Sequence, residues 1–326
     1  MIIITGGAGF IGSFLQAELH ARGEETVVVD WLGHDEKWRN LQLHAPSIML
    51  SPADLEAFLA TEPPVRAVLH MGAISETTAT DGDLVWQTNV ALSQRLWTWC
   101  AKREISFIYA SSAATYGAAA SIDAFSDVPA KLDSLRPLNL YGWSKHVFDQ
   151  WVMRKIANGE KAPPQWAGLK FFNVYGPNEY HKGKMISVIK VKFDEIQRGH
   201  SATLFRSDDP AIEDGHQARD FIWVGDVISV ILWLLDHPEV SGLFNCGTGT
   251  ARTYLDLTKA IFAALNVTPD ISFVNMPAAL QGKYQNFTCA DMSSLRDKGY
   301  DQQFTPLETG IERYIKDYLI AKTPYR

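Results

Sequence analysis

MIIITGGAGFIGS, residues 1–13, is the stretch of sequence that decides the fold. A short apolar run leads into glycines at Gly6, Gly9 and Gly12, and a helical pattern follows directly. Glycines at this spacing allow a tight turn, close approach of the backbone to a pyrophosphate, and close packing of a helix on a strand. The anion would lie at the helix N-terminus. The stretch therefore predicts a dinucleotide-binding turn, with a plain glycine-rich turn as the alternative.

The chain from residue 1 to residue 176 continues the alternation that this turn begins. Short runs rich in β-branched residues occur at 2–5, 26–30, 67–70, 106–110 and 169–174. Longer helical patterns lie between them at 11–22, 83–103 and 141–156. Strands that alternate with helices form βαβ units and a parallel sheet covered on both faces. We therefore predict an α/β fold whose residues 1–176 form an NAD(P)-binding Rossmann domain with a doubly wound parallel sheet.

The order of elements becomes mixed after Gly176. Helical patterns at 186–198, 227–236, 254–265 and 306–320 are separated by short strands, and the segments 118–137 and 207–218 are predicted loops. This pattern predicts a smaller mixed α/β C-terminal substrate lobe over residues 177–326, with some of the chain returning to the Rossmann sheet.

Composition excludes several classes of protein. The 326 residues carry a net charge of −7, which argues against a surface that neutralises nucleic acid or an anionic membrane. Three scattered cysteines, Cys100, Cys246 and Cys289, suggest neither a disulfide framework nor a metal cluster. The apolar start is too short for a signal peptide, and the longest apolar run, 227–235, covers about half of a membrane span. We expect a cytoplasmic protein with no nucleic-acid or membrane partner.

Two features near the second strand bear on the cofactor. Asp30 ends that strand, about twenty residues after the glycines, where a carboxylate accepts from the ribose hydroxyl of NAD. Lys37 and Arg39 follow in the next loop, where cations would neutralise the 2′-phosphate of NADP or would simply be solvated. The residues alone leave both cofactors open.

The remaining cofactor candidates lie at the start of or within helical patterns, or directly after strands. They are Phe10, Ile11, Trp31, Met71, Gly72, Ala73, Ile74, Ser75 and Asn89.

Tyr141 and Lys145 form the predicted catalytic pair. They stand four residues apart in YGWSK within a helical pattern, so they share one face of a helix. A free phenol has a pKa near 10; a nearby ammonium in a partly desolvated cleft would lower it, and the positive charge of an oxidised nicotinamide would lower it further. Ser112, at the end of the preceding strand, would hydrogen-bond the substrate oxygen that Tyr141 deprotonates. The alternatives are a surface tyrosine and a strand-end serine bonded to its own backbone.

Together these residues resemble the extended short-chain dehydrogenase family of sugar-nucleotide epimerases and dehydratases, and within it the ADP-glycero-manno-heptose 6-epimerases. The HKG sequence at 181–183 is the most discriminating feature. The motifs that carry the resemblance are residues 1–13, 109–117, 137–145, 172–185, 219–227, 244–254 and 280–288.

The resemblance implies an isomerase with a tightly held NADP that serves the heptose of the lipopolysaccharide inner core. The implied route oxidises C6 of ADP-heptose, turns the ketone over and returns the hydride to its other face. The resemblance also implies a homo-oligomer, commonly a pentamer, and makes Lys182 a second catalytic base opposite Tyr141. A plain binding cation is the other interpretation of Lys182.

The substrate-side residues also come from the resemblance. It implies that Asn173 and Val174 border the sugar and the nicotinamide. Phe205 would lie near the nucleotide, and Arg219 and Tyr284 would hold the diphosphate. Lys184 and Val191 are substrate-binding candidates that depart from the family pattern, since a small polar residue and a histidine are expected there.

Two other functions stay open. A UDP-sugar 4-epimerase would share Ser112, Tyr141 and Lys145, whereas a dTDP-glucose 4,6-dehydratase is disfavoured by Ala113 and Ala114, which stand where that reaction needs acidic groups. A non-catalytic NAD(P)-binding regulator would need the glycine turn but neither the tyrosine nor the lysine.

Overall fold

A seven-stranded sheet forms the centre of the molecule. The computed structural model describes residues 1–34, 36–119, 121–277 and 285–326. The strand order is β10-β6-β5-β4-β1-β2-β3, and every neighbouring pair is parallel. The strands are β1 (Ile2–Thr5), β2 (Thr26–Val29), β3 (Ile48–Leu50), β4 (Ala67–His70), β5 (Ser106–Ser112), β6 (Trp166–Phe171) and β10 (Gly242–Cys246). The prediction of a doubly wound parallel sheet is confirmed.

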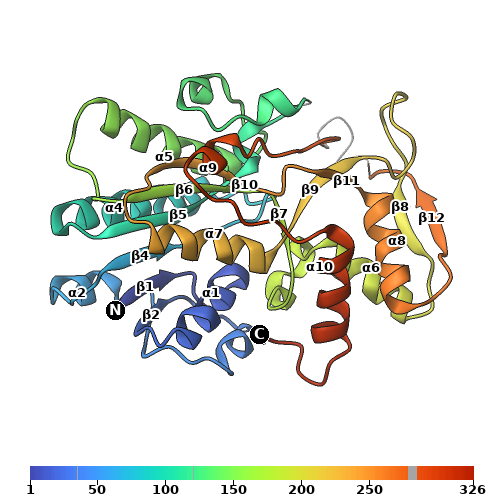
Figure 1. Ribbon diagram of the computed structural model, residues 1–326, viewed down its shortest axis with the longest axis horizontal. Helices are drawn as coiled ribbons and strands as arrows, with labels where there is room; N and C mark the ends of the chain where they lie inside the picture. Colours follow the sequence, from blue (N-terminus) through green and yellow to red (C-terminus); the bar gives the residue numbers. More distant parts are fainter. Residues whose placement is uncertain (35, 120, 278–284) are drawn as a thin grey trace.

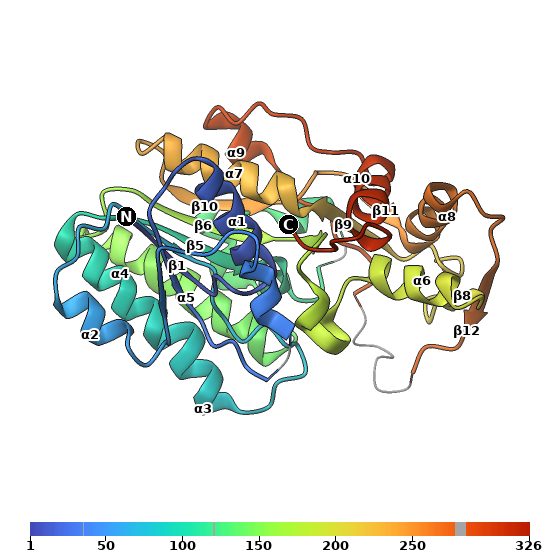
Figure 2. The ribbon, with the colours of Figure 1, turned by 90° about the horizontal axis from the view of Figure 1, so that it is seen from below.

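Helices cover both faces of this sheet (Figure 1). Figure 2 shows α1 (Phe10–Ala21) and α7 (Val224–Asp236) on one side, with α2 (Leu55–Ala60), α4 (Leu92–Arg103) and α5 (Leu140–Ala157) on the other. Side chains alternate along a strand, so Ile2 and Ile4 join the core beneath α1 and α7 while Ile3 joins the core on the opposite face. Burial on both faces explains why the strands are continuous apolar runs.

The predicted helix 83–103 contains a π-helical turn. α3 (Gly82–Val85) runs through the π-turn η2 (Trp86–Ala91) into α4 without a break. A π-turn inserts an extra residue and shifts the side chains that precede it around the helix axis. Asn89 lies in this turn and is fully buried.

The rest of the chain builds two small sheets at one end of the large one. Their strand orders are β11-β9-β7 and β12-β8. The strands are β7 (Asn173–Tyr175), β8 (Ala202–Phe205), β9 (Ala218–Trp223), β11 (Ala251–Thr253) and β12 (Ile271–Val274). The helices here are α6 (Val188–Gln197), α8 (Tyr254–Leu265) and α10 (Leu307–Arg313), and the last continues into the π-turn η7 (Tyr314–Leu319), whereas α9 (Ser293–Asp297) packs beside β10 of the large sheet. The mixed character predicted for this part of the chain is confirmed.

One predicted strand, 169–174, is divided in the structure. β6 ends at Phe171, and β7 begins at Asn173 and pairs with β9 in a different sheet. The Phe172 amide donates to the Cys246 carbonyl, and the Val174 amide donates to the Phe172 carbonyl, so the chain turns away from the large sheet here. This turn carries Asn173 and Val174 towards the site described below.

Short 3₁₀ turns occupy several connections. They are η1 (Glu36–Leu41), η3 (Ala113–Tyr116), η4 (Ile122–Phe125), η5 (Pro129–Ser134) and η6 (Tyr180–Met185). Of the helices that the structure describes, none is both long and apolar enough to cross a membrane. The described residues also contain no cluster of side chains able to hold a metal ion.

Candidate active site

The glycine turn between β1 and α1 depends on contacts between backbone atoms. Gly6 has φ +66°, and a Cβ on it would lie 2.5 Å from Gly72 Cα. A Cβ on Gly12 would lie 2.2 Å from the Gly6 carbonyl oxygen. Neither neighbour can move as a side chain could, so both positions require glycine. The first turn of α1 holds no acidic residue, and no side chain caps it at Gly9. Its amides therefore fit a pyrophosphate.

One cavity of about 990 Å³ opens above this turn, at the carboxyl ends of the parallel strands. This is the edge at which open α/β sheets bind their ligands. Both halves of the chain contribute to its walls. The predicted site residues that line it are Gly6, Gly9, Phe10, Ile11, Gly12, Asp30, Trp31, Lys37, Met71, Gly72, Ala73, Ile74, Ser75, Ser112, Tyr141, Lys145, Asn173, Val174, Lys182 and Arg219.

Asp30 stands directly after β2, and both of its oxygens are engaged. Oδ2 accepts from the Ala8 amide at 2.9 Å, which ties the glycine turn to the second strand. Oδ1 accepts from the Trp31 amide at 2.8 Å and from Lys37 Nζ at 2.7 Å. Lys37 lines the cavity beside Asp30, whereas Arg39 pairs with Glu36 and is not among the lining residues. Of the two cations considered from the sequence, only Lys37 is placed to meet a ligand.

Asn89 does not line the cavity, contrary to the expectation of a direct cofactor contact. Its side chain accepts from the Ile74 amide at 2.8 Å and donates to the Ile74 carbonyl at 2.9 Å. It also donates to Ser144 Oγ, whose hydroxyl donates to the Tyr141 carbonyl. The π-turn directs Asn89 inward, so it joins the loop after β4 to the start of α5 and acts on the site through other residues.

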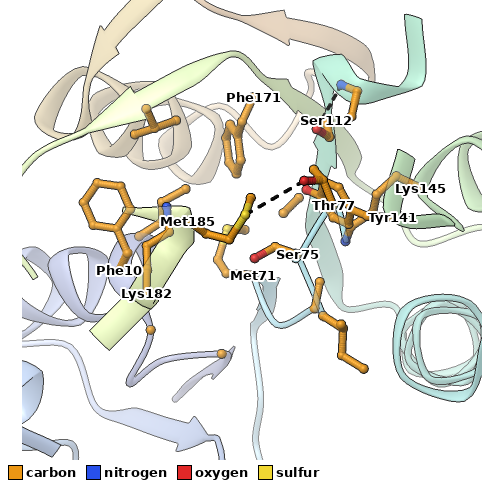
Figure 3. A pocket seen from close by; sticks show the side chains of 18 of the residues that line it. Phe10, Met71, Ser75, Thr77, Ser112, Tyr141, Lys145, Phe171, Lys182 and Met185 are labelled. Atoms are coloured by element: carbon orange, nitrogen blue, oxygen red, sulfur yellow. Dashed lines mark hydrogen bonds between the residues drawn. The ribbon is translucent and has the colours of Figure 1, made fainter. Parts of the chain in front are cut away.

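Ser112, Tyr141 and Lys145 lie together on one wall of the cavity (Figure 3). Ser112 is the last residue of β5, and its Oγ accepts from the Ala114 amide at 3.1 Å. α5 begins at Leu140, where the Asn139 side chain caps the helix by accepting from the Gly142 amide at 2.8 Å. This start places Tyr141 and Lys145 one turn apart, next to the end of β5. The backbone bond considered for Ser112 as an alternative is thus present, and the side chain faces the cavity as well.

The electrostatics of this wall differ from the expectation drawn from the sequence. Burial raises the pKa of the Tyr141 phenol above its usual value of 10.0, and a hydrogen bond with Ser112 only partly opposes this. Burial also lowers the pKa of Lys145 to about 8. Loss of water disfavours the charged form of both groups, so the protein's own groups hold Tyr141 as a phenol. The predicted lowering of this pKa by Lys145 together with an oxidised nicotinamide stays a prediction, since the protein's own groups do not produce it.

Lys182 lies on the opposite side of the cavity, beside Phe10 (Figure 3). Its Nζ is 5.1 Å from the centre of the Phe10 ring. Burial lowers the pKa of Lys182, while the Glu179 carboxylate raises it. Glu179 is fully buried and accepts from the Ser187 amide and from the Tyr314 hydroxyl. Lys182 therefore sits where loss of its proton is easier than in water, next to an anchored carboxylate that limits the effect.

The neighbour of Lys182, His181, is a neutral group. Burial, followed by the charges of Lys37 and Lys182, lowers its pKa to about 4. Asn40 holds its ring at 3.2 Å and also donates to the Asn178 carbonyl at 3.1 Å. The segment that carries Lys182 is thus attached to the loop that carries Lys37.

The substrate side of the cavity is only partly as expected. Arg219, on β9, lines the cavity and lies 5.6 Å over the Tyr254 ring. Lys184, Val191 and Phe205 are not among the residues that line it, so these three predicted contacts stay predictions. Lys184 is exposed beyond the turn at Gly183, Val191 faces outward on α6, and Phe205 lies on β8, which pairs with β12. Tyr284 falls outside the described residues.

The sequence missed several contributors. Gln87, Thr88, Asn139, Met185 and Thr288 line the cavity and come from four separate segments. Only the position of Asn139 directly before the YGWSK helix gave a local signal, as a helix cap. The others become neighbours only when the chain folds. Asp149 and Lys170, an ion pair with 0% side-chain exposure behind Tyr141, were also missed.

Comparison with known proteins agrees with this geometry. A model of the NAD dependent epimerase/dehydratase family matches residues 2–247. The ADP-L-glycero-D-manno-heptose-6-epimerase of Nitratidesulfovibrio vulgaris (strain DP4) is 46% identical over 335 residues, and the match covers 100% of both proteins. The protein of the same name from Fusobacterium nucleatum is 39% identical over 336 residues, again with 100% of both covered.

Solved structures are similar over nearly the whole chain. The Helicobacter pylori ADP-L-glycero-D-manno-heptose-6-epimerase matches with a TM-score of 0.78 and 27% identity, covering 97% of this chain and 95% of that one. The Thermotoga maritima UDP-glucose 4-epimerase matches with a TM-score of 0.76 and 22% identity, covering 97% of each. The second likeness shows the shared fold alone.

The burial of Lys145 predicts a pH-dependent stability. Its folded pKa of about 8 lies below the unfolded value of 10.5, so the unfolded state binds more protons between these pH values. The folded protein therefore bears a penalty of about 3 kcal/mol below pH 8, which disappears as the pH rises towards 10.5. We expect Lys145→Met to be stabilised relative to the parent at about pH 7, and less so at about pH 10, in urea unfolding. Lys190→Met is the control, because it removes a lysine that does not line the cavity. A difference that stays constant with pH would contradict the assignment.

Proposed function

The chain belongs to the NAD dependent epimerase/dehydratase family, among its ADP-L-glycero-D-manno-heptose-6-epimerases, and from that premise we propose that it inverts C6 of ADP-D-glycero-D-manno-heptose. One observation carries the proposal: Tyr141 and Lys182 line opposite walls of a single cavity that also contains the glycine turn. Inversion through a ketone moves the oxygen on C6 from one side of the site to the other, so this oxygen loses its proton in one position and regains a proton in the other. Two proton-transfer groups on facing walls satisfy that requirement.

The residues at the glycine turn fit a nicotinamide dinucleotide. The backbone of Gly6 and the start of α1 would hold its pyrophosphate, and Asp30 and Lys37 lie where the adenosine ribose would reach. When bound, an oxidised nicotinamide accepts the hydride of C6 and returns it to the other face of the carbonyl. Its positive charge would also favour the phenolate of Tyr141, which the protein alone does not.

Each side chain then has a role. Tyr141 takes the proton of the C6 hydroxyl, and Ser112 donates a hydrogen bond to the same oxygen. Lys145 stabilises the phenolate from one helical turn away. After the ketone has turned over, Lys182 supplies the proton on the opposite side as the hydride returns. Arg219 pairs with the diphosphate, since a guanidinium matches two phosphate oxygens.

Finer properties are part of the same proposal. We infer that the cofactor is NADP, that the product serves lipopolysaccharide heptose synthesis, and that the chain forms a homo-oligomer. A cytoplasmic location is supported by Cys100, Cys246 and Cys289, each of which is a buried free thiol.

The direct test of the function incubates the protein with ADP-heptose and follows the configuration at C6 by NMR. Inversion at C4 of a UDP-sugar instead would make the chain a 4-epimerase.

Tyr141→Phe should lower epimerisation by about 10²–10⁴-fold, because it removes the group that exchanges the hydroxyl proton. The ring remains, so the nucleotide retained on purification should be unchanged. NMR of the product and the nucleotide content measure the two effects separately. Unchanged turnover would remove Tyr141 from the mechanism, and unchanged behaviour in every assay would favour a binding protein without catalysis.

Lys182→Ala should reduce epimerisation more than it reduces a single hydride transfer, because only the second proton transfer is removed. The single transfer is read from the ultraviolet absorbance of reduced nicotinamide after substrate is added. Lys184→Ala is the matched control, since Lys184 stands in the same segment, carries the same charge and does not line the cavity. Equal losses in both steps would leave Lys182 as a binding cation only.

Lys37→Met should weaken NADP binding by about 10-fold or more while changing NAD binding little, because a single cation beside a phosphate oxygen is lost. Arg39→Met is the matched control: Arg39 stands two residues away, pairs with Glu36 and is absent from the cavity wall. Calorimetry with each dinucleotide gives the two affinities. Mass analysis that finds only NAD released from the denatured protein would overturn the choice of NADP.

A further inference from the structure

Behind the catalytic wall, α5 carries a third polar group on the same stripe. Asp149 stands four residues after Lys145 and eight after Tyr141, and it is fully buried. Its Oδ1 accepts from the Tyr109 hydroxyl at 3.1 Å, and its Oδ2 accepts from Ser111 Oγ at 2.7 Å. Tyr109 and Ser111 belong to β5, the strand that ends at Ser112. Asp149 therefore attaches the catalytic helix to the catalytic strand.

The partner of Asp149 is Lys170 from β6. Lys170 Nζ lies 2.9 Å from Asp149 Oδ2, and both side chains have 0% exposure. The same ammonium donates to Thr115 Oγ1 at 2.7 Å and lies 5.0 Å from the centre of the Tyr116 ring, both on the 3₁₀ turn that follows Ser112. Neither member of the pair lines the cavity. The pair thus joins α5, β5, β6 and η3 without contact with a ligand.

Stability gives little reason for such a pair. Removing two charges from water costs several kcal/mol for each ion, and well-packed apolar side chains often replace a buried pair at no loss. The core nevertheless keeps Lys170 and Asp149 behind Tyr141, whose protonation state matters for the proposed reaction. The pair therefore points to an electrostatic role. The field of Asp149 reaches the cavity: its carboxylate acts to raise the pKa of both Tyr141 and Lys145, although burial is the larger influence on each.

We propose that Lys170 is a positioning residue for catalysis: it cancels the charge of Asp149, so that the carboxylate can hold α5 on β5 without opposing ionisation of Tyr141. The inference rests on the proposed function for the role of Tyr141. It adds a residue outside the cavity, Lys170, to those that the reaction requires. A carboxylate without its cation would hold the proton on the phenol, whereas a cation without its carboxylate would help to release it.

Other titratable groups around the pair are neutral or distant. Burial raises the pKa of Tyr109 and of Tyr116 well above the usual value. Burial lowers the pKa of His70, on β4 near Lys145, to about 3. These three groups do not change charge between about pH 6 and pH 9.

Four further groups complete the surroundings. His146, also on α5, has a pKa lowered first by burial and then by Lys170; it also feels Asp133 and Arg136 near the start of the helix. Asp127, near Tyr116, has a pKa raised by burial. A change of pH profile on altering the pair must be compared with a His146→Gln variant, because the charges of Lys170 and Asp149 also act on the pKa of His146.

Two single variants test the proposal by opposite signs. Lys170→Met leaves the carboxylate uncompensated and should move the pH profile of kcat/KM to higher pH by about one unit. Asp149→Asn keeps the shape of the side chain but removes its negative charge. The Lys170 cation then remains alone and should move the profile to lower pH by a similar amount. The double variant Lys170→Met/Asp149→Asn carries no net change of charge and should return close to the parent profile. Lys170→Arg keeps the positive charge and should therefore keep the parent pH profile.

A second readout does not need the sugar substrate. The ultraviolet absorbance of the phenolate, taken as the difference from a Tyr141→Phe variant with oxidised NADP added, should shift with pH in the same directions. Failure of ADP-heptose turnover with these shifts intact would refute the proposed function and leave this inference standing.

The outcomes against the inference are equally distinct. A merely structural pair would lower kcat/KM at every pH, with no shift of profile or phenolate titration and no recovery in the double variant. Shifts of the same sign in both single variants would also overturn it. Lys190→Met, which breaks the ion pair with Asp194 on α6 away from the cavity, is the charge-matched control and should leave the profile unchanged. If Lys170→Met does not fold, the direction in which Asp149→Asn moves the pH profile, and its return in the double variant, still test the inference.

Discussion

The contact of backbone on backbone at the glycine turn is the constraint on which the site depends. Gly6 stacks on Gly72 so closely that a single added carbon would lie 2.5 Å from the neighbouring Cα. This contact joins the ends of β1 and β4, the point at which the strand order reverses. It directs the N-terminus of α1 at the place where an anion must sit, and the loop after β4 forms the other side of the same cavity.

The cavity is built by both halves of the chain. Tyr141 and Lys145 belong to a helix packed on the large sheet, whereas Lys182 and Arg219 come from segments that follow the departure of the chain at Phe172. The single interruption between β6 and β7 is therefore decisive, because it changes the direction of the chain and supplies the opposite wall of the cavity. Without it, the cavity would have the glycine turn and the Tyr141 wall but would lack Lys182 and Arg219.

Burial controls the chemistry of this wall in two directions at once. It makes Lys145 easier to deprotonate and Tyr141 harder, so in the protein alone Tyr141 is held as the neutral phenol. Ionisation of the phenol then depends on positive charge brought near it and on keeping negative charge away. Seen in this way, the Lys170–Asp149 pair and the cationic form of the nicotinamide act on one quantity, the free energy of the Tyr141 phenolate.

The sequence by itself determined the parallel sheet, the glycine turn and the identity of Tyr141, Lys145 and Ser112, because these follow from local spacing: apolar runs, glycines that a tight turn demands, and two residues one helical turn apart. Tertiary structure alone decided that Asn89 faces inward from a π-turn, that Lys37 and not Arg39 reaches the cavity, and that Lys184, Val191 and Phe205 lie outside it. It also decided that burial raises the pKa of Tyr141 and that Asp149 pairs with Lys170. The physical reason is that burial and long-range pairing depend on which segments meet in space, and residue spacing along the chain carries no record of that.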